Sequence, residues 1–316
     1  MAKRRITVLI LTAALVCAFS GCKVNNQATG DSGKVNIVCT VFPVYDWVNE
    51  IVGENSDKFN ITLLASGGDL HSYQPSAADI AAIHTCDLFI YVGGETDKWA
   101  EKIVATQKLN ALSLLKINKD ALLDAWHEHS HGHDGEDLAV YDEHVWLSLR
   151  LAQQTVSALC DEVCNFDSAD ADIYKKNSFE YCEKLKALDK DFERTVEASK
   201  NKTIVFADRF PFIYMTTDYG VECYAAFPGC SSDTNAGFEV VAHLAEKVKE
   251  FDKHTLLVLE NSNQEVAAAV INASGMKDVE IAVMHSLQAI GADDAENNDY
   301  ISIMEENLDA FKKALE

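Results

Sequence analysis

The chain has 316 residues, of which 48% are hydrophobic and 24% charged, and its formal net charge is −23 at pH 7. This length predicts two domains in the mature protein. The negative charge argues against a nucleic-acid partner, because nucleic-acid binding needs basic patches.

An N-terminal targeting segment precedes the part that folds. Basic residues at positions 3–5 are followed by an apolar stretch over 6–19, which is the pattern of a signal peptide. A small residue pair directly before Cys22 resembles a bacterial lipobox, so we expect residues 1–22 to be a lipoprotein signal peptide and Cys22 to be acylated. An ordinary secretory signal cleaved nearby is the alternative. Residues 23–34 are polar and predict a flexible tether. The mature protein is therefore expected to be exported and lipid-anchored on the outer face of the cytoplasmic membrane, or periplasmic.

Predicted strands and helices alternate along the first half of the mature chain. Short apolar or β-branched runs predict strands, and apolar residues at spacings of three and four predict helices. Such alternation favours a parallel sheet with helices on both faces, and we expect it to form an N-terminal lobe over residues 35–166. The strands are expected at 35–44, 59–65 and 88–92, and the helices at 45–52, 76–84 and 146–163.

A long charged stretch over 169–199 contains no glycine or proline and carries an apolar stripe that includes Tyr181, Leu188 and Val196. It predicts a single helix, and at 1.5 Å per residue about thirty residues span about 45 Å, the length of a domain. A surface helix is the simpler interpretation. We favour a rigid connector over 167–200 that joins two lobes.

The second half repeats the alternation and predicts a C-terminal lobe over 201–316. Its strands are expected at 203–207, 255–260 and 280–284, and its helices at 212–219, 237–250, 264–274 and 300–315. The predicted fold class is α/β: two lobes, each a parallel-sheet α/β sandwich, joined by one long rigid connector helix.

The nine cysteines do not form a recognisable metal motif. Cys17 lies in the signal peptide and Cys22 is the lipid candidate, so seven remain and at least one is unpaired if all disulfides are intramolecular. Cys223 and Cys230 flank a turn and could form a disulfide. Because no CxxC pair occurs, a cysteine zinc cage is not expected.

Histidines gather in one segment, where they alternate with other polar residues. Half of the ten histidines in the chain lie between 127 and 144. Imidazole suits zinc, copper and nickel, and a short histidine-rich tract is a compositional sign of metal binding. We expect the loop 127–137 to capture metal weakly and so to raise its local supply. Its histidines are His127, His129, His131 and His133.

Three isolated histidines fall beside predicted strand or helix ends. His71 follows the strand at 59–65, His144 precedes the helix at 146–163, and His285 directly follows the strand at 280–284. Ligands of open α/β sheets bind outside the carboxyl ends of the strands. One such histidine is more often structural, but three of them, spread over both halves, indicate a shared metal site.

Several of these segments resemble one family. The run TVFPVYDWVNEIVGE, the motif HSYQPS that begins at His71, and the motif HVWL that begins at His144 resemble the cluster A-I substrate-binding proteins of bacterial zinc and manganese ABC transporters. The resemblance covers nearly the whole mature chain. It implies two α/β lobes joined by a long rigid helix, a metal in the cleft, and His71 and His144 as ligands. It also implies an ABC permease and its ATPase as partners of a monomeric receptor.

The second lobe departs from the family pattern. Arg209 stands at the usual third ligand position by spacing, and arginine has only donors, so it cannot bind a metal. His285 stands where the family usually has aspartate. We therefore expect three imidazoles, from His71, His144 and His285, with Asp208, Glu260 or water completing a tetrahedron. Imidazole ligands favour zinc over manganese, as does the resemblance of the His-rich loop to that of zinc-specific members.

The expected function is extracytoplasmic capture of Zn²⁺ and its delivery to an ABC permease. A manganese-specific receptor of the same family and a zinc-buffering or adhesin lipoprotein are the alternatives, because a fold does not fix a function. An enzyme is not expected. A three-histidine zinc site with an open position can be catalytic, but the chain lacks the HExxH, Gly-x-Ser-x-Gly and P-loop motifs.

Overall fold

The computed structural model describes residues 33–64, 72–125, 141–229 and 236–316. The predicted signal peptide with Cys22, residues 23–32 of the predicted tether, His71 and the histidines of the loop 127–137 lie outside these ranges. So does Cys230, and its pairing with Cys223 stays a prediction. Among the helices in the described ranges, none combines the length and apolarity needed to cross a membrane.

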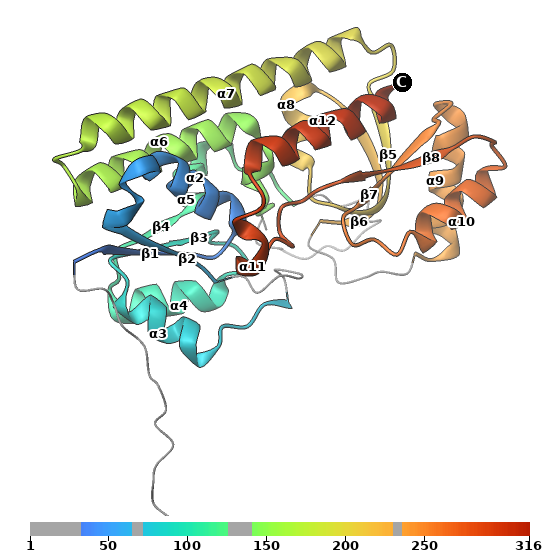
Figure 1. The fold of residues 1–316 in the computed structure, drawn as a ribbon. Coiled ribbons are helices and arrows are strands. Elements are labelled where there is room, and N and C mark those ends of the chain that lie inside the picture. Colours follow the sequence, from blue (N-terminus) through green and yellow to red (C-terminus); the bar gives the residue numbers. More distant parts are fainter. Residues whose placement is uncertain (1–32, 65–71, 126–140, 230–235) are drawn as a thin grey trace, which may run out of the picture. The chain divides into compact units, whose positions relative to one another are not determined.

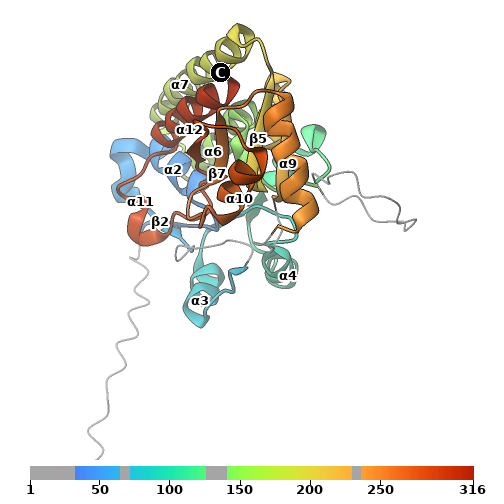
Figure 2. The same cartoon turned by 90° about the vertical axis from the view of Figure 1, so that its right-hand side faces the viewer.

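The first sheet contains four parallel strands in the order β2-β1-β3-β4. Side chains of alternate residues point to opposite faces of a strand. Val38 and Phe89 pack toward the helices α3 and α4, and Ile37 and Ile90 pack on the opposite face with Trp47 of α2. Figure 1 and Figure 2 show this layering. The elements are β1 (Val35–Cys39), α2 (Phe42–Val52), β2 (Phe59–Leu63), α3 (Ala77–Thr85), β3 (Leu88–Tyr91), α4 (Lys98–Gln107), β4 (Ala111–Ser113) and α5 (Leu114–Ile117).

The prediction of a strand over 35–44 is wrong beyond Cys39. The apolar run continues, but α2 already begins at Phe42, with Pro43 in its first turn. Proline suits this position because its missing N–H would have no partner inside the helix and its fixed φ is helical. Apolarity alone therefore did not separate the strand from the helix that follows it.

The second sheet repeats the strand order of the first, with four parallel strands in the order β6-β5-β7-β8. Val205 and Leu256 pack toward the helices α9 and α10, whereas Ile204 and Leu257 pack in the main core with Phe311 of α12. The elements are β5 (Thr203–Phe210), α8 (Ile213–Tyr219), β6 (Glu222–Pro228), α9 (Phe238–Glu250), β7 (Thr255–Leu259), α10 (Glu265–Ser274), β8 (Glu280–Met284), α11 (Ala292–Ala295) and α12 (Tyr300–Leu315).

Two long helices lie between the sheets in the sequence. A 3-10 turn at Val145–Leu147 precedes α6 (Leu149–Phe166), and α7 (Ala171–Ala198) follows with 28 residues. At 1.5 Å per residue α7 is about 42 Å long, close to the predicted connector. It packs against α6 and α2 and also against α12 (Figure 1). We call the residues around the first sheet the first lobe and those around the second sheet the second lobe.

Candidate metal site at the ends of the strands

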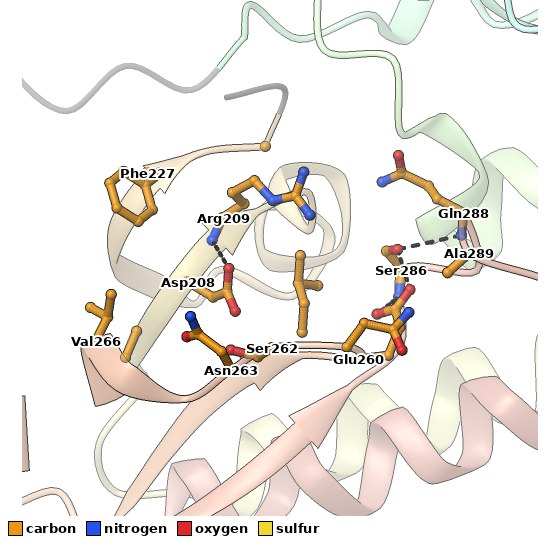
Figure 3. Close-up of a pocket in the computed structure, with 14 residues that line it drawn as sticks. Asp208, Arg209, Phe227, Glu260, Ser262, Asn263, Val266, Ser286, Gln288 and Ala289 are labelled. Carbon is orange, nitrogen blue, oxygen red and sulfur yellow. Dashed lines mark hydrogen bonds between the residues drawn. The ribbon is translucent and has the colours of Figure 1, made fainter. Parts of the chain in front are cut away.

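A cavity of about 480 Å³ lies at the carboxyl ends of the strands of the second sheet (Figure 3). Residues from the ends of all four strands meet there, as expected for the ligand site of an open α/β sheet. Its lining is Ala207, Asp208, Arg209, Phe227, Gly229, Leu259, Glu260, Asn261, Ser262, Asn263, Val266, Ser286, Gln288 and Ala289.

Glu260 places a carboxylate in this lining directly after β7. The backbone N–H of Ser286 donates to Oε2 at 2.8 Å, and the Ser286 hydroxyl donates to Oε1 at 2.5 Å. Burial raises the pKa of Glu260 above its usual range, although both hydrogen bonds oppose this shift. Each oxygen keeps a further lone pair. A bound cation would offset the cost of burying the charge.

Asp208 and Arg209 reach the same cavity from the end of β5. The strand runs to Phe210, three residues beyond the predicted end, with an irregular register between Phe206 and Arg209 in its pairing with β6. The backbone N–H of Arg209 donates a hydrogen bond to Oδ1 of Asp208 at 2.8 Å. Figure 3 shows the side chains of both residues at this strand end. The second lobe thus offers two carboxylates, and the guanidinium of Arg209, which also lines the cavity, is not a ligand.

His144 is fully buried at the start of the 3-10 turn that precedes α6. Its Nδ1 lies 2.8 Å from Oδ1 of Asp142, which also accepts the His144 backbone N–H at 2.9 Å. The Asp142 carbonyl accepts the hydroxyl of Tyr214, on α8, at 2.8 Å. Burial would lower the pKa of His144, but the charge and hydrogen bond of Asp142 outweigh it and the pKa is raised above its usual value.

The His144 ring lies against the wall of the cavity. A Cβ atom added at Gly229, a lining residue, would be 3.1 Å from Cε1 of His144 and 2.8 Å from the carbonyl oxygen of Phe210. With Nδ1 bonded to Asp142, Nε2 is the nitrogen that would bind a metal. This arrangement, in which a carboxylate orients a histidine, is typical of zinc sites.

His285 does not line the cavity. Its Nε2 is 3.8 Å from Oε2 of Glu306 on α12, and its backbone is hydrogen-bonded to Asn307. Among the described residues, no three His, Cys, Asp or Glu side chains gather closely enough to hold a metal. The structure thus brings Asp208, Glu260 and His144 to the cavity or its wall. The roles of these three residues, and those of His285 and His71, as metal ligands stay predictions.

Trp146 and Ser286, which were not among the predicted ligands, connect these groups. The Trp146 indole N–H donates to the Ser286 carbonyl at 2.9 Å, and the Tyr300 hydroxyl donates to the Trp146 carbonyl at 2.6 Å. Trp146 lies two residues after His144, and Ser286 donates two hydrogen bonds to Glu260. The hydrogen bond between Trp146 and Ser286 therefore links the segment of His144 to Glu260. The sequence signal for Trp146 was its place in the HVWL motif, and that for Ser286 was its position directly after His285.

Comparisons with known proteins agree with this architecture. A family model described as "Zinc-uptake complex component A periplasmic" matches residues 37–314. The zinc-binding lipoprotein AdcA of Streptococcus pneumoniae is 31% identical over 310 residues, which are 96% of this chain and 60% of that protein. The chain thus spans about three-fifths of the length of this relative.

Two further relatives match over nearly their whole length. The high-affinity zinc uptake system protein ZnuA of Bacillus subtilis is 29% identical over 97% of this chain and 94% of that protein. The crystal structure of the Zn(II)-bound ZnuA-like domain of S. pneumoniae AdcA has a TM-score of 0.69 and 28% identity, and the match covers 90% of this chain and 99% of that domain. Because the family model spans both sheets and the helices between them, this chain belongs to the family of the periplasmic component A of zinc-uptake complexes.

Proposed function

We propose that this protein is an extracytoplasmic receptor that binds Zn²⁺ between its two lobes and delivers it to an ABC permease and its ATPase. The observation that carries the proposal is the buried pair His144 and Asp142 against the wall of a cavity that also holds Glu260 and Asp208. Family membership supports the same role, and the names of the relatives describe zinc binding and zinc uptake.

The proposed ligands combine described and undescribed residues. His144 contributes Nε2 from the first lobe, and Glu260 contributes a carboxylate oxygen from the second, with Asp208 as the alternative. His71 is the further imidazole, and His285 remains a candidate that would have to leave Glu306. A mixed set of imidazoles and one carboxylate is a normal zinc environment.

A manganese receptor is the second candidate, and the two carboxylates at the cavity favour it. Manganese prefers oxygen ligands and higher coordination numbers, whereas zinc accepts several imidazoles. If Asp208 and Glu260 both bind the metal, the preference of the site shifts toward manganese. If only one binds, zinc is favoured.

The proposal includes attachment to the membrane through a lipid on Cys22 and action as a monomer. The lipobox-like sequence and the lipoprotein name of the AdcA relative support the anchor. The role is binding rather than catalysis, because the family is one of uptake components. In cells, zinc-limited growth should depend on this protein together with the permease.

Native mass spectrometry of the mature chain with Zn²⁺ and Mn²⁺ in competition tests the proposal. The expected result is one tightly bound zinc per chain. His144→Ala and Glu260→Gln should each strongly lower the affinity for this zinc. Asp208→Asn and His285→Ala in the same titration identify the remaining ligands. Preferential binding of manganese would overturn the zinc assignment, and the absence of any tight metal would overturn the receptor function.

A further inference from the structure

Ser286, directly after His285, makes two hydrogen bonds to Glu260, one of the candidate ligands. It is 3% exposed, and its N–H and hydroxyl donate to the two different oxygens of the Glu260 carboxylate. In Figure 3 the Ser286 side chain lies directly beside this carboxylate at the edge of the cavity. Two donors from one residue fix the plane of a carboxylate, whereas one donor lets it rotate about the bond.

The turn that carries Ser286 is held on both sides. Before it, the buried Asn307 of α12 accepts the His285 N–H at 2.6 Å and donates to the His285 carbonyl at 2.9 Å. After it, Leu287 is buried with a φ of 62°, a left-handed conformation that a bulky residue adopts only when its surroundings impose it. Ser286 therefore has little freedom to move away from Glu260.

The first lobe holds the same turn. The indole of Trp146, which is 1% exposed, donates to the carbonyl of Ser286 at 2.9 Å. The rings of Trp146 and His144 are in edge contact, with centroids 5.3 Å apart and an interplanar angle of 65°. Ser286, which is hydrogen-bonded to Glu260, is thus also hydrogen-bonded to Trp146, in the segment that carries His144.

We propose that Ser286 is a positioning residue that orients the Glu260 carboxylate for the metal. The inference rests on the proposed function, because it takes Glu260 as a ligand. Ser286 does not touch the metal. Its N–H and hydroxyl occupy one lone pair on each oxygen, so the remaining lone pairs point in fixed directions before the metal arrives. The carboxylate then loses little rotational freedom when it binds.

The test measures zinc affinity by competition with a fluorescent zinc chelator on the mature chain. Ser286→Ala removes the hydroxyl and should weaken zinc binding about tenfold, the lower end of the range for loss of an outer-shell partner. Ser286→Thr keeps the hydroxyl and should restore most of the affinity. Since Ser286 acts through Glu260, adding Ser286→Ala to Glu260→Gln should change the affinity by less than about twofold.

Ser148 provides a matched control. Its hydroxyl donates to Oδ2 of Asp218 at 2.5 Å, the same bond type and length, and neither residue lines the cavity. Ser148 also caps α6 through the Leu151 N–H. Ser148→Ala should therefore lower the melting temperature at least as much as Ser286→Ala does while leaving zinc affinity within about twofold of the parent.

The outcomes separate the two proposals. If the parent binds no zinc tightly, the receptor function is wrong. If the parent binds zinc and Glu260→Gln changes nothing, the function stands and the role of Ser286 is wrong. The role of Ser286 is also wrong if Ser286→Ala matches the parent, or if it weakens binding equally in the parent and in Glu260→Gln.

Discussion

The Nδ1 atom of His144 lies 2.8 Å from Oδ1 of Asp142, with both side chains shielded from solvent. A carboxylate at this distance keeps the proton on Nδ1 and leaves Nε2 as the basic nitrogen. The backbone N–H of His144 donates to the same oxygen, so the ring and its main chain are oriented by one group. The negative charge of Asp142 also makes Nε2 of the imidazole more basic, so that it binds a metal cation more strongly.

Removing this carboxylate should weaken metal binding without removing a ligand. We expect Asp142→Ala to lower zinc affinity by about 10- to 100-fold, because the imidazole loses both its orientation and its added basicity. Chelator competition measures the change. In a His144→Ala background the same substitution should have almost no further effect, and a large additional loss there would mean that Asp142 acts elsewhere.

Gly229 should be intolerant of a side chain for a reason specific to the site. A Cβ atom at this position would lie 2.8 Å from the Phe210 carbonyl oxygen and 3.1 Å from Cε1 of His144. Because the backbone of Phe210 cannot easily yield, His144 would be displaced. We expect Gly229→Ala to cost about 1–3 kcal/mol of stability by overpacking and to weaken zinc binding.

Gly275 is the control for a glycine that matters only to the backbone. It ends α10 with a φ of 65°, and a Cβ atom there would meet nothing within 4 Å. Gly275→Ala should cost about 1 kcal/mol through the left-handed conformation and leave zinc affinity unchanged. Equal effects of both substitutions on zinc binding would show that the loss follows stability and not the site.

Asp46 should make stability depend on pH. The pKa of Asp46 is raised to about 7, mainly by burial. The charges of Glu50 and Asp299 raise it further, and hydrogen bonds from Tyr181 and the Tyr300 backbone lower it. The unfolded chain releases this proton near pH 4. Between about pH 4 and 7 the folded state therefore binds more protons, and stability falls as pH rises through this window.

Asp46→Asn should remove this contribution, because an amide stays neutral at every pH and can still accept the Tyr181 hydroxyl. We expect the variant to be more stable than the parent at pH 8, by at most roughly 4 kcal/mol. The two should converge toward pH 4. Denaturant unfolding at a series of pH values measures the difference, and a gap that does not change with pH would contradict the assignment.

The histidine-rich loop should act separately from the tight site. Deleting residues 127–137 should leave the affinity for the first zinc nearly unchanged and remove several weaker equivalents, since alternating histidines suit loose capture. Isothermal titration of the deletion variant and the parent distinguishes the two classes. Loss of the tight equivalent with the loop would show that the loop itself supplies ligands.

Secondary structure was most predictable where one periodic pattern stood alone. The strand at 280–284 and the helix at 300–315 have the predicted bounds, and the connector is only a few residues shorter than expected. The short strand β4 and the strand β6 were not predicted. β4 has three residues, and β6 (Glu222–Pro228) contains no β-branched residue. Both are strands because they pair with β3 and β5, which is information from tertiary structure.

The candidate site was predictable in residue type but not in detail. His144, Asp208 and Glu260 were recognisable because they carry ligand atoms beside predicted element ends. The hydrogen bonds from Ser286 to Glu260 and from Trp146 to Ser286 join residues 26 and 140 positions apart. No local pattern encodes such pairs. Nor does the position of His285 after a strand reveal that its ring faces Glu306.

The helix α7 has a mechanical consequence for the whole molecule. It places Tyr181 and Leu185 in the same apolar cluster as Trp47 of the first lobe, and Phe192 in contact with Phe311 of the second. If one lobe unfolded, the apolar side chains that the other lobe and α7 contribute to this cluster would be exposed to water. Thermal denaturation should therefore be a single cooperative transition, and the amides of α7 should exchange with solvent only when the entire chain opens.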